Sequence, residues 1–472
     1  MDSNNRVVKA GVGYTIGNFF VKGLNFVTIP IFARLLSTTD YGLYNTYLAY
    51  EGIFFSLIGL ALQMSLKNAK YRYGDKYEEY VSSIVLFEVI LMVVWIAVIL
   101  VSYKPLSYLM GYEKVILLLL VVHCTSSSIL TLYNIHLSLN YSYKKYLIVT
   151  GANAVLNIGT SIILILTIFN DERFLGRVLG TVLPLVGVTA IICFFFWKRH
   201  KPTIKKKYWR FGLFYSMPLI PHAISQVLLN QFDRIMIKEM VGASYAGIYS
   251  FAYNIFMIIS VVMISLDNVW SPWFYENYQK GYKKAIKIRS VQYVKGMLLL
   301  TLLIMLISPE LVQLLGTADY YEAIYCVIPI CAGGFFMFIY TIPAQVEYYM
   351  GKTYYIAFGT ACAAFIKILL NLLFIPRYGY FSAAYTTEFA FILYAIFHFL
   401  ISKKLDGTNL FDNKGLLIMS LICIVVSLFA SALVEYYLIR WIGVVGVLFY
   451  YTRRNYNTIK VYFLKIGCKR NY

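Results

Sequence analysis

The chain has 472 residues, of which 60% are hydrophobic and only 14% are charged, with a mean hydropathy of +0.68. A soluble protein carries about 25% charged and roughly 45–50% apolar residues, so the composition excludes a soluble globular protein and predicts an all-α polytopic membrane protein embedded in the lipid bilayer. The seven cysteines are odd in number and lack metal-type spacing. We therefore expect no disulfide framework, no metal site and no cofactor.

Apolar stretches of about 20 residues recur along the whole chain and predict about fourteen transmembrane helices joined by short connections. The expected spans are 10–36, 41–66, 81–103, 115–138, 146–169, 174–197, 211–241, 245–267, 291–308, 323–349, 354–375, 381–402, 415–434 and 437–452. The last span is the weakest, because Glu435 and Arg440 crowd its start.

The positive charge follows this segmentation. Most of the 42 Lys and Arg residues fall in alternate connections, counted from the N-terminal segment, and the loops 198–210 and 280–289 are the richest. Basic loops stay on the cytoplasmic side of a membrane, so we expect both termini to be cytoplasmic. The net charge of +20 is then a topology signal, and we expect no nucleic-acid partner.

A short motif occurs twice, as LLSTTDYGLYN at 35–45 and MVGASYAGIYS at 240–250. At a constant offset of 205 residues, Gly42 aligns with Gly247. The repeat indicates a duplicated membrane protein, and such duplications are typical of transporters. The basic loop before residue 211 divides the copies. We expect three regions: an N-terminal six-helix bundle at 1–200, a parallel C-terminal six-helix bundle at 201–405, and an extra helix pair with a basic cytoplasmic tail at 406–472.

Polar side chains form stripes on two equivalent helices that both contain proline. In 10–36 the stripe is Tyr14, Asn18, Lys22 and Asn25; in 211–241 it is His222, Gln226, Asn230 and Asp233 or Arg234. Lys22 lies about 12 residues from the nearer end of its span, too deep for easy snorkelling at about 1.5 Å per residue. Ionisable groups at such depth normally face a cavity or a partner. The alternative is that the amides are interhelical hydrogen-bonding groups.

Further polar groups occupy other spans. Lys367 precedes Asn371 by one turn, and Glu51 lies near the middle of its span. Arg234 and Lys367 could instead snorkel outward, and Asp233 could be a local ion pair or a proton-linked carboxylate. We take as candidate substrate-binding residues Lys22, Arg234, Lys367, Asn18, Asn25, Gln226 and Asn230. Candidate ion-coupling residues are Glu51, Asp233 and His222.

These residue types favour binding over catalysis. Cations suit a phosphate or pyrophosphate, while Asn, Gln and Tyr suit hydroxyl-rich sugars. No nucleophile–base pair or Gly-rich phosphate loop is visible in the sequence, so we assign no catalytic residue and do not expect an enzyme.

The segment 211–255, with DRI at 233–235 and GIY at 247–249, closely resembles the seventh and eighth helices of bacterial polysaccharide repeat-unit flippases of the O-antigen and capsule type. Residues 17–45 resemble their first helix and turn. The resemblance covers roughly residues 6–405 and extends to the superfamily of multidrug-and-toxin extruders (MATE) and the lipid II flippase, which implies a MATE-like fold.

The resemblance implies translocation of an undecaprenyl-pyrophosphate-linked oligosaccharide across the bacterial cytoplasmic membrane by alternating access. Lys22 and Arg234 would be the pyrophosphate contacts, and a polymerase and other glycan-assembly proteins would be partners. Many of these flippases have twelve helices, so the pair at 415–452 is a departure whose role is open. Alternatives are an ion-coupled multidrug or cation antiporter of the same fold, a polysaccharide polymerase or ligase, and a scaffold without transport.

Overall fold

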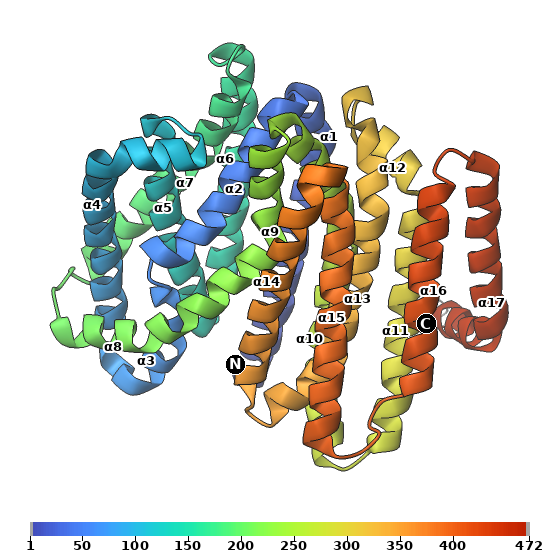
Figure 1. Cartoon of the computed structure of the whole chain (residues 1–472). Coiled ribbons are helices and arrows are strands. Elements are labelled where there is room, and N and C mark those ends of the chain that lie inside the picture. Colours follow the sequence, from blue (N-terminus) through green and yellow to red (C-terminus); the bar gives the residue numbers. More distant parts are fainter. Residues whose placement is uncertain (1–2, 469–472) are drawn as a thin grey trace. The chain divides into compact units, whose positions relative to one another are not determined.

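The computed structural model describes the backbone of residues 3–468, and the side chains from Gly13 to Arg453 except those of residues 15, 16, 18, 19 and 25. Asn18 and Asn25 therefore lie outside the described side chains. The fold is all-helical, and the described range contains no strand (Figure 1). This confirms the fold class that the composition predicts.

The chain forms two compact units, Met1–Gly247 and Ile248–Tyr472. The helices of the first unit, with the helix α10 that begins in it, are α1 (Ser3–Leu35), α2 (Thr38–Ile58), η1 (Leu62–Ser65), α3 (Leu66–Tyr73), η2 (Gly74–Lys76), α4 (Tyr77–Met110), α5 (Lys114–Leu139), α6 (Tyr143–Thr167), α7 (Arg173–Arg199), α8 (Lys206–Ser216), η3 (Met217–Leu219), α9 (Ile220–Met240) and α10 (Ala243–Gln279). The division of the sequence repeat near residue 200 stays a prediction.

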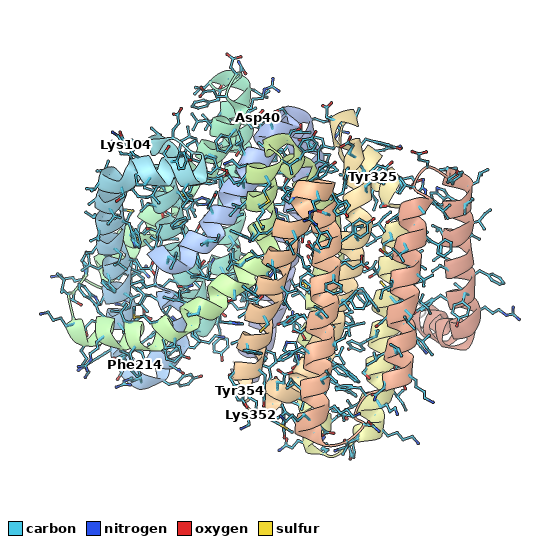
Figure 2. All side chains as sticks on the ribbon, in the orientation of Figure 1. Asp40, Lys104, Phe214, Tyr325, Lys352 and Tyr354 are labelled. Atoms are coloured by element: carbon cyan, nitrogen blue, oxygen red, sulfur yellow. The ribbon has the colours of Figure 1, made fainter. Side chains whose placement is uncertain are left out.

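The second unit continues α10 and adds a further set of helices. These are α11 (Lys283–Leu306), α12 (Ser308–Leu315), η4 (Ala318–Ala323), α13 (Ile324–Tyr349), α14 (Thr353–Tyr378), α15 (Ser382–Asp406), α16 (Asn413–Ala432) and α17 (Tyr437–Cys468). In Figure 2, Tyr325 lies at the opposite end of this unit from Lys352 and Tyr354, as expected for the two ends of a spanning helix.

Within the described residues, eleven helices are long and apolar enough to cross a membrane. The other three expected spans fall on α1, α2 and α17, which are helical but are not among the eleven. α2 carries Asp40, Asn45 and Glu51, and such a polar helix suits the interior of a bundle better than contact with lipid. The count of fourteen membrane spans stays a prediction.

Proline breaks the helix that we expected at 211–241. Pro218 falls in the 3₁₀ turn η3, which separates α8 from α9, and Pro221 occupies the first turn of α9. Figure 1 shows α8 running across the lower part of the view and α9 rising from its end. A proline removes a backbone donor and crowds the preceding turn, which accounts for the break. Pro30, in contrast, lies inside the continuous helix α1.

The two copies of the repeated motif contact each other within the first unit. A Cβ placed on Gly42 would lie 1.8 Å from the carbonyl oxygen of Ala243, and one placed on Gly247 would lie 2.0 Å from that of Thr38. The hydroxyls of Thr38 and Ser244 are hydrogen-bonded at 2.7 Å. The starts of α2 and α10 therefore cross backbone against backbone, which only glycine permits at both positions.

Candidate functional site

A line of polar side chains follows one side of α9. Asn230 Nδ2 donates to the backbone oxygen of Gln226 at 2.7 Å and lies 3.5 Å from its Oε1. Arg234 donates from one guanidinium nitrogen to the backbone oxygen of Asn230 at 3.4 Å. All three side chains are half-buried. The spacing of four residues thus aligns two amides and a guanidinium, as the sequence predicted.

The adjacent side of α9 packs on α2, which fixes the orientation of the polar line. Gly52 faces Val227 and Gln231, because a Cβ there would meet the first at 3.0 Å and the second at 3.6 Å. The Thr46 hydroxyl donates to the backbone oxygen of Arg234 at 3.4 Å. The contact uses a glycine and a small hydroxyl side chain, so the two helices approach closely.

Asp233 and His222 lie at the two ends of this line and differ in their surroundings. Asp233 is only 1% exposed, so its carboxyl group is held inside the first unit beside the Arg234 position. His222 lies on the first turn of α9, and its buried Nδ1 has no hydrogen-bond partner in the described part of the chain. A buried polar atom of this kind calls for a partner such as water or a ligand.

Lys22 lies on α1, which the described contacts hold against α5 and α6. The Tyr14 hydroxyl donates to the backbone oxygen of Leu137 at 3.0 Å, and its ring meets that of Tyr146 edge to face at 5.0 Å. The Lys22 side chain is half-buried. That Lys22 and Arg234 act in one site stays a prediction.

Glu51 lies on the side of α2 that faces α5. The Cys124 thiol of α5 is 3.6 Å from the backbone oxygen of Glu51. One turn earlier, the Tyr47 hydroxyl is 3.1 Å from Nδ1 of His123, and the two rings stack. Glu51 therefore belongs to a polar layer between α2 and α5, whereas Gln226, Asn230 and Arg234 follow α9.

Arg177 is a cation that our sequence interpretation did not include among the candidate site residues. Its guanidinium lies 3.8 Å from the centre of the Phe32 ring and 4.6 Å from that of Tyr44. It also donates to Asn157 at 2.8 Å and to Ser161 at 2.6 Å. One side chain thus joins α1, α2, α6 and α7 through cation–π contacts and hydrogen bonds.

A sequence signal for this cluster existed but was incomplete. In the sequence, Asn157 lies one turn after Asn153 within an apolar span. Gly180 marks a close approach, since a Cβ there would lie 2.3 Å from the Cα of Ser161. The pairing with Arg177, however, depends on the contact between α6 and α7. No residue spacing along the chain shows that contact.

Lys367 belongs to the second unit. It lies on α14 and is only 1% exposed, so it does not snorkel to the surface. Asn371, one turn later, is fully buried and accepts a hydrogen bond from the Thr386 hydroxyl of α15. Lys367 and Asn371 are therefore interior residues of their unit. No group of three or more potential metal ligands occurs among the described residues.

Comparisons with known proteins agree on fold and context. The family model described as polysaccharide biosynthesis protein matches residues 7–278. A protein of the Lsg locus of Haemophilus influenzae is 24% identical over 338 residues, which are 66% of this chain and 77% of that protein.

Two solved structures show the fold. The lipid II flippase MurJ in an inward closed conformation superposes with a TM-score of 0.74 at 14% identity, covering 94% of this chain and 99% of that one. An inward-facing multidrug resistance transporter of the MATE family superposes with a TM-score of 0.64 at 14% identity, covering 82% and 94%. The chain therefore has a MATE- and MurJ-like fold.

Proposed function

Because the chain belongs to the polysaccharide biosynthesis protein family, we propose that it translocates undecaprenyl-pyrophosphate-linked oligosaccharide repeat units across the bacterial cytoplasmic membrane by alternating access. The product would serve O-antigen, capsule or exopolysaccharide synthesis. The family match and the flippase-like fold support a polytopic membrane transporter of polysaccharide biosynthesis. The finer substrate assignment rests on the polar line of α9.

That line matches the two chemical parts of such a substrate. The guanidinium of Arg234 is permanently charged and presents a planar set of donors that suits phosphate oxygens. The amides of Gln226 and Asn230 continue the line toward the start of α9 and can exchange hydrogen bonds with sugar hydroxyls. Lys22 and Lys367 would add positive charge for the diphosphate, as the sequence interpretation proposed.

The test replaces the cations and measures transport apart from folding. A charge pair about 4 Å apart near a protein surface is worth about 4 kcal/mol before desolvation. Even half of this value corresponds to about a 30-fold loss of binding. We expect Arg234→Ala and Lys22→Ala to reduce flipping of a fluorescent undecaprenyl-diphosphate oligosaccharide in proteoliposomes by at least tenfold.

Arg199→Ala is the matched control, since this arginine is exposed at the end of α7. It should transport normally and reconstitute to the same level. Unchanged transport in both Arg234→Ala and Lys22→Ala would overturn the assignment of the cations. An equal loss of transport in Arg199→Ala would show that the assay responds to folding or reconstitution of the protein and not to the loss of these cations.

Two carboxyl groups, of the half-buried Glu51 and the buried Asp233, favour a second candidate, an ion-coupled exporter of organic cations on the same fold. Glu51 and Asp233 lie inside the first unit, where a carboxylate could bind a cation or a proton. In this case Glu51→Gln or Asp233→Asn would abolish efflux of a fluorescent organic cation driven by a pH gradient. Efflux by the native chain that resists both substitutions, or no efflux at all, would leave the lipid-linked substrate as the better assignment.

A further inference from the structure

The role of the last two helices is open, and a groove within the second unit bears on it. The groove has a volume of about 600 Å³, within the range of pockets that hold organic ligands. It runs between α11, α16 and α17, which lie side by side at the right of Figure 1. Its lining is mostly aliphatic and includes Leu298, Leu302, Ile418 and Val447.

The polar members of the lining gather at one end. Lys295 lies at the middle of α11, toward the start of the stretch from Val291 to Leu302 that lines the groove. Asp412 immediately precedes α16, and Tyr450 and Tyr451 are the last residues of α17 in the lining. Because α11 and α16 run parallel in the expected topology and α17 runs antiparallel to both, these positions all lie toward the cytoplasmic end of the groove. The groove is thus apolar along its length and carries a cation, a carboxylate and two phenols at its cytoplasmic end.

This end differs from a simple basic patch. Lys295 is exposed, and a cation at the edge of the hydrocarbon region is stabilised by a lipid phosphate. A purely anionic head group would, however, meet the Asp412 carboxylate as well. The Asp412 carboxylate at the start of α16 also complements the dipole of that helix. The helix dipole alone, however, does not account for its position in the same groove as Lys295.

We propose that the groove binds one phosphatidylethanolamine molecule, a lipid whose head group carries both charges. Lys295 binds the phosphate, Asp412 accepts hydrogen bonds from the primary ammonium, and the acyl chains lie along the aliphatic lining. The lipid fills the cytoplasmic half of the space between α11 and the helix pair α16–α17. At the other end, Arg440 of α17 contacts α11 and α12 directly.

The experiment is native mass spectrometry of the full-length chain in detergent, titrated separately with phosphatidylethanolamine, phosphatidylcholine and phosphatidylglycerol of identical acyl chains. We expect the ethanolamine lipid to bind about tenfold more tightly than the other two. The choline lipid has no N–H to donate to Asp412, and the glycerol lipid brings only negative charge.

Variants separate the two contacts. Lys295→Ala should lower affinity for the ethanolamine and choline lipids about tenfold, while Asp412→Asn should abolish the preference between these two lipids. Lys287→Ala is the matched control, because this lysine is exposed on the same helix but does not line the groove. It should bind like the native chain.

Equal binding of the three lipids, or a preference for the glycerol lipid, would overturn the proposal. So would displacement of bound phosphatidylethanolamine by undecaprenyl diphosphate at equal concentration, which would assign the groove to a polyprenyl chain. These readouts involve no transport, so the proposal can fail while the proposed function holds, and the reverse.

Discussion

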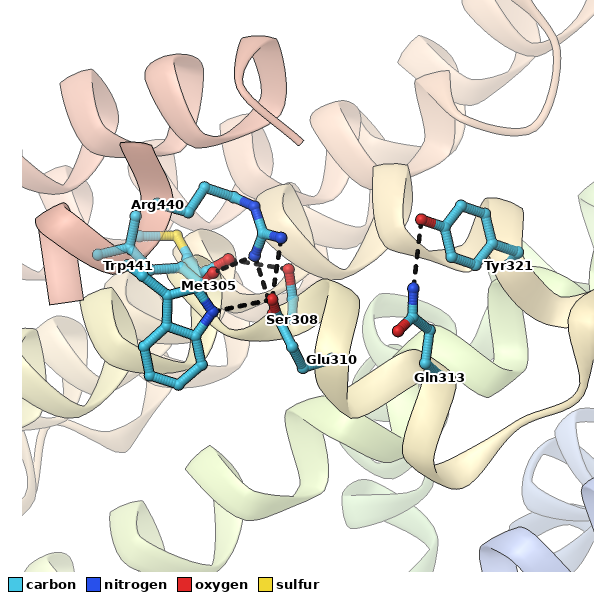
Figure 3. Close-up of polar contacts among 8 residues, drawn as sticks. Met305, Ser308, Glu310, Gln313, Tyr321, Arg440 and Trp441 are labelled. Atoms are coloured by element: carbon cyan, nitrogen blue, oxygen red, sulfur yellow. Dashed lines mark hydrogen bonds and ion pairs between the residues drawn. The ribbon is translucent and has the colours of Figure 1, made fainter. Parts of the chain in front are cut away.

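The contact that ties the last helix to the rest of the second unit gives the sharpest stability prediction. Arg440 binds the Glu310 carboxylate through two nitrogens, at 2.8 Å and 3.0 Å, and donates to the backbone oxygen of Leu306 at 2.7 Å. The indole nitrogen of Trp441 donates to the same carboxylate at 3.2 Å (Figure 3). The Arg440 side chain is 5% exposed and that of Glu310 is 30% exposed.

We predict that Arg440→Ala detaches α17 locally. Breaking a buried ion pair costs about 3–5 kcal/mol, and the partial exposure of Glu310 lowers this to roughly 3 kcal/mol. A cost of about 3 kcal/mol corresponds to roughly a 100-fold increase in the open population. Hydrogen exchange of the α17 and α12 amides in the detergent-solubilised chain should accelerate by about this factor, while peptides of α5 stay unchanged.

The double-mutant cycle with Glu310→Ala tests whether the pair itself is responsible. Because each single variant leaves the other charge without its partner, the double variant should lose about 2 kcal/mol less than the sum of the two single losses. Exchange in α17 that changes less than threefold in Arg440→Ala, or strictly additive losses in the cycle, would refute this reasoning.

Three further predictions concern groups described above. Burial by itself would raise the pKa of Glu310, but the hydrogen bonds from Arg440 and the other donors outweigh it and hold the pKa below the usual 4.5. The stability that this group contributes is therefore complete above about pH 4.5 and is lost as the pH falls through the lowered pKa. Hydrogen exchange of α17 measured over an acid titration, with Glu310→Gln as the comparison, will check this dependence. Gly42→Ala should lower the free energy of unfolding by about 1–3 kcal/mol, because the Ala243 carbonyl cannot move aside. The measurement is denaturation of the chain in detergent. Gly151→Ala is the control: no atom lies within 4 Å of its new Cβ, so it should not destabilise the chain. Arg177→Lys should recover only part of the stability lost in Arg177→Ala, since an ammonium cannot lie flat between two rings; full recovery in thermal unfolding would show that charge alone matters.

The fold class and the position of most helices could be predicted because the bilayer imposes a length and an apolar composition on each span. Segments outside that constraint were predicted less well. α3 and α12 fell in expected connections, because charged residues prevent membrane insertion but not helix formation. α17 likewise extends to Cys468, well beyond the expected end at 452.

The candidate site was predictable where it depends on one helix. Gln226, Asn230 and Arg234 align because helical periodicity alone sets their spacing. Contacts between helices were not predictable, since Arg177 meets Phe32 from another part of the chain and Arg440 meets Glu310 across 130 residues. Residues that looked like isolated charges in the sequence thus have specific partners in the structure.

The crossing of Gly42 and Gly247 has a consequence for the history of the chain. After an internal duplication, the two copies of a segment are usually free to accumulate different changes. Here each copy supplies the backbone that occupies the space a methyl group would need in the other. A larger residue in either copy would clash with the other copy, so both glycines are required by a single contact. The two turns therefore share one steric constraint, whereas Lys22 and its counterpart Val227, at the same offset of 205 residues, are different residues.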